Sequence, residues 1–126
     1  MNNWFEFEFN EPYKGKEITS VNGVRLPEQY MKFMREHNGG VGDIGETWLM
    51  LYPLEELEEI NEEFEMERWL PNHIIIGSNG GGELYGLDSQ GNYFNVPVII
   101  EKDCIHYLGN DIYQLPDRIN EMWRNM

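Results

Sequence analysis

Two glycine-rich stretches of the sequence have spacings that occur in phosphate-binding loops. Gly40–Gly45 reads GVGDIG and matches the G-x-G-x-x-G dinucleotide fingerprint, and Gly77–Gly82 reads GSNGGG after a predicted strand. The fingerprint requires a strand before it and a helix after it, because the pyrophosphate binds at the helix N-terminus. Here the predicted order is reversed, and the second stretch lacks the lysine that reaches the phosphates of a P-loop. Both stretches therefore favour loops or turns that need glycine's backbone freedom.

Nucleophiles and metal ligands are present, but their spacing does not form a catalytic or metal-binding set. Ser89 would need a glycine at position 87 to form a nucleophile elbow, and that residue is Leu87. Cys104 is interpreted as an ordinary buried thiol. Asp88–Asn92 begins like a calcium loop but lacks its glycine and its final glutamate. The histidines share no zinc-type spacing: they are His37, His73 and His106. We therefore predict no catalytic residue, no metal site and no cofactor.

The remaining chemical feature is a dense run of glutamates between Leu54 and Leu70. Eight glutamates and one base, Arg68, give this segment a charge of −7, half of the net charge of −14. At 100° per residue, a helix over 53–67 places a band of glutamates opposite an apolar stripe. The band consists of Glu55, Glu58, Glu59, Glu62 and Glu63, and the stripe of Leu57, Ile60 and Phe64.

Two interpretations of this carboxylate band stay open. Like charges four residues apart, such as Glu55 and Glu59 or Glu58 and Glu62, cost roughly 1 kcal/mol in total. The band can be a solvated face that aids solubility. It can also be a docking surface for a cationic protein, in which case association would weaken as salt rises.

Composition and charge limit the classes of partner and function. The 126 residues fit one domain spanning 1–126, and a hydrophobic share of 40% is typical of a globular chain. Nine basic against 23 acidic residues argue against binding to nucleic acid or anionic membranes, because both partners are polyanions. The single cysteine cannot form an internal disulfide, and no signal peptide or membrane span is visible. We therefore expect a cytoplasmic protein.

The elements that carry these residues are predicted from hydrophobic periodicity and turn residues. Phe5, Phe7 and Phe9 alternate with glutamates, as in a half-buried strand, and 10–25 read as turns. A helix runs from Leu26–Pro27 to Asn38, with an apolar stripe at positions 30, 33, 34 and 37. Further strands are expected at 47–52, 73–77, 83–87 and 93–100. A turn at 111–114 and a helix from about 116 follow, with an inward face formed by Leu115, Ile119, Met122 and Trp123.

Four ordered stretches together resemble the SUKH superfamily, which joins bacterial immunity proteins to a yeast regulator of cell-wall assembly. They are Leu26–Gly40, Trp48–Asn61, Ile74–Gly91 and Tyr107–Leu115, so the resemblance covers about residues 18–115. The residues that match the family pattern are interpreted as mainly structural. They are Leu26, Pro27, Tyr30, Asn38, Gly39, Gly40, Gly77, Gly80, Gly81, Gly82 and Glu83.

The resemblance implies an α+β fold in which helices pack on a mixed, largely antiparallel sheet. It also implies a non-catalytic role, since bacterial members neutralise a polymorphic toxin, often a nuclease, by binding it. A nuclease must be basic to hold a polyanion, so an acidic inhibitor can imitate the phosphate chain. The alternatives are a regulatory adaptor on an endogenous partner, or a ligand-binding domain or enzyme that uses Glu83.

Overall fold

A seven-stranded sheet organises the chain, which we describe for residues 3–126 of a computed structural model. The strands of this sheet are β1 (Phe7–Phe9), β4 (Gly40–Asp43), β5 (Trp48–Leu51), β6 (His73–Ser78), β7 (Glu83–Asp88), β8 (Tyr93–Pro97) and β9 (His106–Tyr107). A separate hairpin consists of β2 (Ser20–Val21) and β3 (Val24–Arg25). The helices are α1 (Glu28–Glu36), α2 (Leu57–Glu63), α3 (Met66–Trp69) and α4 (Leu115–Arg124), with 3-10 turns η1 (Leu54–Glu56) and η2 (Lys102–Cys104).

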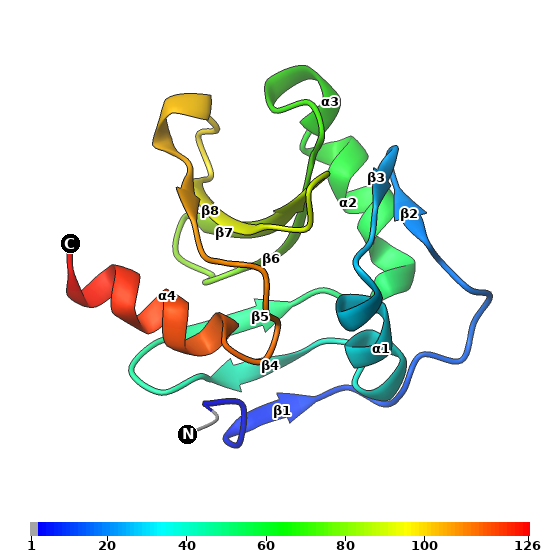
Figure 1. The fold of residues 1–126 in the computed structure, drawn as a ribbon, viewed down its shortest axis with the longest axis horizontal. Helices are drawn as coiled ribbons and strands as arrows, with labels where there is room; N and C mark the ends of the chain where they lie inside the picture. The colour runs from blue at the N-terminus through cyan, green and yellow to red at the C-terminus, as the bar shows by residue number, and fades with distance from the viewer. Residues whose placement is uncertain (1–2) are drawn as a thin grey trace.

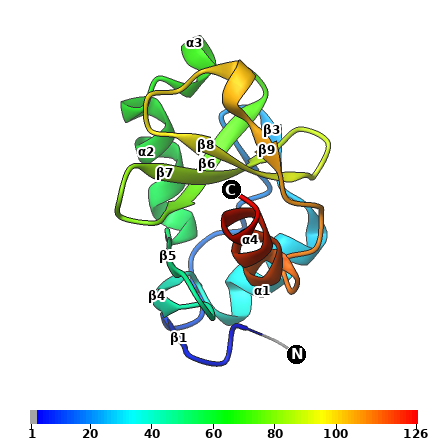
Figure 2. The same cartoon turned by 90° about the vertical axis from the view of Figure 1, so that its left-hand side faces the viewer.

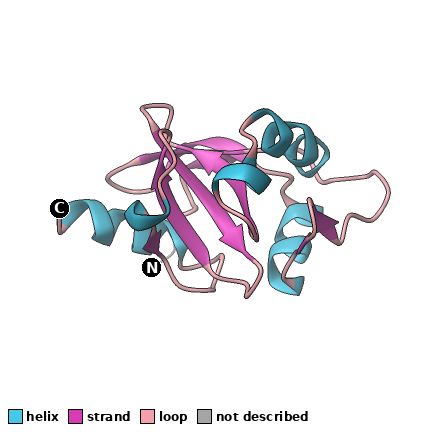
Figure 3. Cartoon of the chain, turned by 90° about the horizontal axis from the view of Figure 1, so that it is seen from above, coloured by secondary structure: helices cyan, strands magenta, loops and turns pink. Residues whose placement is uncertain are grey.

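The strands follow one another through the sheet in the order β1-β4-β5-β6-β7-β8-β9. From β4 to β9 this is a meander, and every described pair of neighbours is antiparallel. β1 joins β4 only after the β2–β3 hairpin and α1 have intervened (Figure 1). Figure 3 shows the strands in the middle of the molecule with the helices around them. The predicted α+β fold with a largely antiparallel sheet is therefore confirmed.

The ladder between β5 and β6 is short. Only Met50–Ser78 and Leu51–Gly77 pair there, and Tyr52 N–H donates to Ile76 O at 2.9 Å. A Cβ on Gly77 would lie 2.4 Å from the carbonyl oxygen of Met50, so glycine permits this close approach. Figures 1 and 2 show the two portions that this junction connects, β1-β4-β5 and β6-β7-β8.

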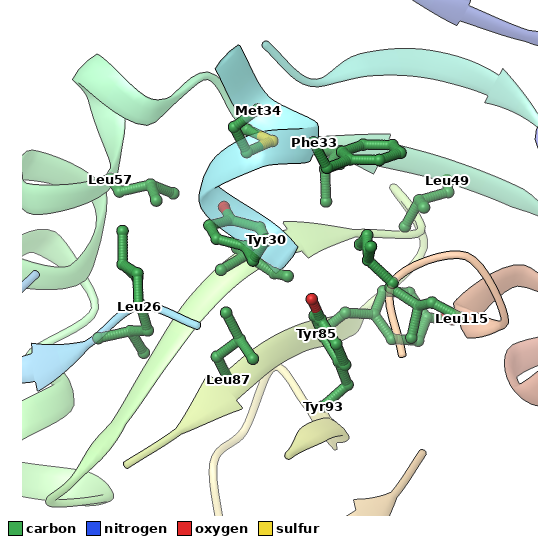
Figure 4. Packing of buried hydrophobic residues seen from close by; sticks show 14 of the residues in the cluster. Leu26, Tyr30, Phe33, Met34, Leu49, Leu57, Tyr85, Leu87, Tyr93 and Leu115 are labelled. Carbon is green, nitrogen blue, oxygen red and sulfur yellow. The ribbon is translucent and has the colours of Figure 1, made fainter. Parts of the chain in front are cut away.

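The main core lies on one face of the sheet, beneath α1, the β2–β3 hairpin and α4. Tyr30, Phe33 and Met34 of α1 are buried there, as their helical spacing predicts. Figure 4 shows these side chains grouped with Leu87 and Leu115, which come from the sheet and from α4. Burial of such large side chains is worth roughly 1.5–3 kcal/mol each, so this cluster supplies much of the stability of the fold.

A second, smaller cluster occupies the opposite face of β6–β8. Ile74 and Ile76 belong to the main core while Ile75 belongs to this cluster, because successive strand residues point to opposite faces. Met66, the first residue of α3, and Leu70, which directly follows α3, cover it. The sheet is thus buried on both faces at β6–β8, and the contacts of Met66 and Leu70 with this cluster fix α3 against the sheet.

A substitution at Gly86 tests the tight packing of this second face. A Cβ there would lie 2.0 Å from the carbonyl oxygen of Ile74 and 2.5 Å from Cζ of Phe94, in the middle of β7. We expect Gly86→Ala to lower the free energy of unfolding by about 1–3 kcal/mol, since backbone must shift to admit the methyl group. Gly81→Ala is the matched control, because its Cβ would meet no atom closer than 3.6 Å. Equal urea midpoints for the two variants would contradict the expectation.

The N-terminal strand prediction is partly wrong. β1 begins only at Phe7, and Phe5 is 69% exposed instead of facing the core. Trp4 takes the buried position, and its Nε1–H donates to the carbonyl of Ile112 at 3.0 Å. The chain forms a turn before β1, where Phe7 N–H donates to Trp4 O, so the period-two pattern breaks between Phe5 and Phe7.

Three further predictions from periodicity are corrected. Residues 10–25 contain the β2–β3 hairpin, whose turn residues Asn22 and Gly23 have φ angles of 47° and 81°. Gly40–Gly45 is not a loop throughout, because its first four residues form β4 between β1 and β5. The strand predicted over 93–100 ends at Pro97, and the short η2 and β9 follow.

The C-terminal prediction holds. The turn at 111–114 leads into α4, with a proline in its first turn, and Leu115 and Ile119 are fully buried. Met122 and Trp123 are half-buried against the same core. Among residues 3–126, every helix is too short or too polar to cross a membrane.

Candidate functional site

The acidic segment, which we define as Leu54–Leu70, is a series of three short helical pieces. The continuous helix predicted over 53–67 is therefore wrong. α2 ends at Glu63, Glu65 adopts a left-handed conformation with φ 54° and ψ 45°, and α3 starts at Met66. This break redirects the chain so that Met66 and Leu70 reach the second core cluster. Tertiary burial thus outweighs the cost of a left-handed glutamate, which is about 1–2 kcal/mol.

Asn38 fixes the start of the acidic segment. Its side chain is 5% exposed, and its Oδ1 accepts the Leu54 N–H at 2.9 Å. Its Nδ2 donates to Oε1 of Glu55 at 2.7 Å. The side chain therefore caps a free N–H of η1 from a distant part of the chain, in the way that a local N-cap would.

Asn61 fixes the middle of the segment, and the sequence interpretation missed it. It is fully buried in α2, where its Nδ2 donates to Leu57 O at 2.8 Å and to Ile75 O at 2.9 Å. Its Oδ1 accepts the Ile75 N–H at 2.6 Å. The N–H and the carbonyl of Ile75 are thus both hydrogen-bonded to the Asn61 side chain, as they would be to the backbone of a neighbouring strand. The sequence did contain a clue to its burial: Asn61 lies four residues after Leu57, and therefore on the apolar side of an otherwise acidic helix.

The glutamates of the band face solvent. Glu58, Glu59, Glu62 and Glu63 are all exposed on α2. Among residues 3–126 the ion pairs are Arg68–Glu65 at 3.6 Å and Arg124–Glu46 at 3.3 Å, so within this range these four carboxylates have no cationic partner. Glu55 is also exposed, but it differs from the others because it accepts the Asn38 amide.

Two hollows adjoin α3 and share no lining residue. The acidic hollow, of about 300 Å³, is lined by Asn22, Asn61, Glu62, Glu65, Met66, Glu67 and Arg68. The apolar hollow, of about 380 Å³, is lined by Phe64, Trp69, Val98, Ile99, Ile100 and Glu101. The acidic segment therefore presents carboxylates and a neighbouring apolar depression, an arrangement suited to binding another protein.

Comparison with protein families gives one result that covers most of the chain. A model of the SMI1 / KNR4 family (SUKH-1) matches residues 16–118. The chain belongs to this family. Its members act in general through protein interaction. A search of curated proteins finds no match to this chain.

The family-signature residues of this SMI1/KNR4 member lie mostly at packing and turn positions. Leu26 and Tyr30 are buried in the main core. Pro27 directly precedes Glu28, so α1 begins just after the predicted start at Leu26–Pro27. Gly39 has a φ of 81°, and a Cβ there would lie 2.3 Å from the carbonyl oxygen of Leu51. Gly40 is buried beside β1 in the same close-packed region.

The glycine-rich loop of this family member is a hairpin turn between β6 and β7. Asn79 closes it, because its Oδ1 accepts the N–H groups of Gly81 at 2.7 Å and Glu83 at 3.1 Å. A Cβ on Gly80 would lie 3.2 Å from the Trp48 ring, and Gly82 O accepts the Val98 N–H at 2.8 Å. The N–H groups that would cradle a phosphate in a P-loop are thus used within the turn.

The other candidate chemical residues have local partners. Glu83 accepts a hydrogen bond from Asn95 Nδ2 at 3.1 Å, across the ladder between β7 and β8. Asp88 Oδ1 accepts the backbone N–H groups of Gln90 and Asn92, which closes the β7–β8 turn. Cys104 is half-buried, not buried as predicted. Over residues 3–126, no three histidine, cysteine or acidic side chains gather as a metal site would require.

Proposed function

We propose that this single-domain protein is a cytoplasmic immunity protein that neutralises a basic toxin, in particular a nuclease, by covering its polyanion-binding surface. The observation that carries the proposal is the set of exposed glutamates on α2 that form no ion pair with any residue from 3 to 126. A nuclease holds a polyanion with clustered lysines and arginines, and a rigid row of carboxylates presents the same charge to them. The protein performs no chemistry in this role, since it acts by occupying the toxin's site.

The structure of the acidic segment favours a rigid inhibitor over a flexible acidic tail. Asn38 holds its first turn, Asn61 ties α2 to β6, and Met66 anchors α3 in the core. Because the segment is ordered before binding, little conformational entropy is lost when a partner docks. Family membership supports binding as the mode of action.

A matched pair of variants tests the proposal. Neutralising Glu58, Glu59, Glu62 and Glu63 to glutamine raises the formal net charge from −14 to −10. The control neutralises four exposed acids near the N-terminus, Glu6, Glu8, Glu11 and Glu17, and has the same net charge. We expect the α2 variant to associate about tenfold more slowly with the basic toxin encoded by the neighbouring gene, and to lose protection of cells that express it. The control should retain both.

The outcomes separate the alternatives. Equal losses in both variants would mean that net charge matters and the α2 band does not. Full protection by both variants would reject the electrostatic mechanism. If no toxin is bound and loss of the gene changes the phenotype of toxin-free cells, the regulatory adaptor replaces the proposal.

A further inference from the structure

The apolar hollow exposes more hydrophobic surface than an isolated surface residue would. Trp69, Val98 and Ile99 are 49%, 47% and 78% exposed, and all three line it. α3 and the chain after β8 approach from opposite sides at the same end of the molecule (Figures 1 and 2). A contiguous apolar depression on a strongly charged protein is typical of an interaction site, because its exposure is otherwise unfavourable.

Two structural features hold this surface in place. Pro97 ends β8, and the Val98 N–H is fixed to Gly82 O, so Val98 and Ile99 extend past the last paired strand residue. On the other side, the guanidinium of Arg68 lies 4.7 Å from the centre of the Trp69 ring, while the same arginine pairs with Glu65. Tryptophan positioned in this way before binding is a frequent energetic centre of protein interfaces.

The acidic residues around the apolar hollow favour a partner that carries basic residues. Glu101 lines it, Glu65 and Glu67 are exposed just before α3 and within it, and Asp103 is exposed on η2. Arg68 is already engaged by Glu65, and Lys102 is an exposed base next to Glu101. The acidic hollow also adjoins α3, through Met66, Glu67 and Arg68. An apolar side chain that enters the hollow would therefore be best accompanied by lysine or arginine.

We propose that the apolar hollow is the central docking site for the protein partner, and that it receives a bulky aliphatic or aromatic side chain flanked by basic residues. The acidic hollow receives one of those bases. This proposal rests on the proposed function for the basic character of the partner, and it adds where the partner docks. The carboxylates of α2 then steer association, while Trp69 and Ile99 determine how slowly the complex dissociates.

Ile99→Asp tests the proposal against simple charge attraction. The side chain is largely exposed, so the fold is retained, which circular dichroism checks. The variant is more acidic, and a partner held by charge alone would bind at least as tightly. A partner seated in the hollow would bind about 30-fold more weakly. The control is Phe5→Asp, which adds the same charge at a residue that is 69% exposed outside the hollow. Equal affinity of the two variants for the neighbouring-gene toxin would overturn the proposal and leave the proposed function standing.

If that toxin is not bound at all, a peptide experiment tests whether the apolar hollow binds an apolar side chain flanked by basic residues. The probe is a capped peptide with two leucines flanked by lysines. Its two controls replace the lysines by glutamates or the leucines by serines. The readout is the indole N–H signal of Trp69, assigned with Trp69→Phe, and Trp48 serves as an internal reference because it is 37% exposed outside the hollow. We expect a saturable shift of Trp69 with the leucine–lysine peptide only. A shift of Trp48 alone, equal shifts with all three peptides, or none at about 1 mM peptide would reject the site.

Discussion

Replacing Asn61 by leucine lowers the free energy of unfolding by about 2–6 kcal/mol, which is the largest effect that we expect from a single substitution. Leucine fills the space of the amide, but it cannot pair with the N–H or the carbonyl of Ile75. Each buried backbone group left without a partner costs about 1–3 kcal/mol. Because the same amide ties α2 to β6, the loss also loosens the acidic segment.

Urea denaturation and hydrogen exchange measure this effect. The control is Glu62→Leu, which introduces the same side chain at the next, exposed position of α2. We expect the Ile75 amide to lose protection in Asn61→Leu and to keep it in the control. A loss of stability below about 1 kcal/mol would mean that the strand finds another partner for Ile75.

Alkaline pH destabilises the protein steeply, through the buried tyrosines. Burial raises the pKa of Tyr30 and of Tyr93 far above the ordinary value, because the ionised phenolate would lose its hydration. In the unfolded chain both ionise near pH 10, so above that pH the unfolded state binds fewer protons than the folded state. Their contribution to stability is complete below about pH 10 and is lost as pH rises. The expected slope is about 2.7 kcal/mol per pH unit for the pair.

Unfolding midpoints in urea between about pH 8 and pH 12 test the slope. Burial also raises the pKa of Tyr85, which makes the dependence steeper, although the hydrogen bond from Trp123 opposes the shift. Tyr30→Phe should remove about 1.4 kcal/mol per pH unit from the slope. Tyr113→Phe, at an exposed position, should leave it unchanged. A wild-type protein whose stability is flat above pH 10 would show that the tyrosines reach solvent.

Periodic side-chain patterns predicted the parts of the fold that are amphipathic over several residues. The apolar stripe of α1 and the apolar strand β6 are examples, since Tyr30, Phe33 and Ile75 occupy buried positions. β4 was hidden because Gly40 and Gly42 carry no side chains and so leave no alternation to detect. The β2–β3 hairpin had a usable signal, namely Asn22–Gly23 between two valines, which is the preferred sequence of a two-residue turn.

Only those features of the candidate site that depend on residues close together in the sequence could be predicted. The exposed face of α2 follows from helical geometry, and the early end of the helix does not alter it because Glu58 to Glu63 lie within one uninterrupted piece. The break at Glu65 has no glycine or proline to announce it, since it results from burial of Met66 and Leu70. The apolar hollow joins Phe64 and Trp69 to a segment about 30 residues later, a contact that no spacing rule reveals.

The acidic segment is a connection between two strands that pair directly with each other, β5 and β6. Its exposed positions take no part in the ladder on either side. Apart from the buried residues that hold it, such as Leu57, Asn61 and Met66, the connection can therefore diversify while the sheet stays as it is. The same scaffold can in this way acquire new binding partners through substitutions confined to one stretch of chain, without having to evolve a new fold.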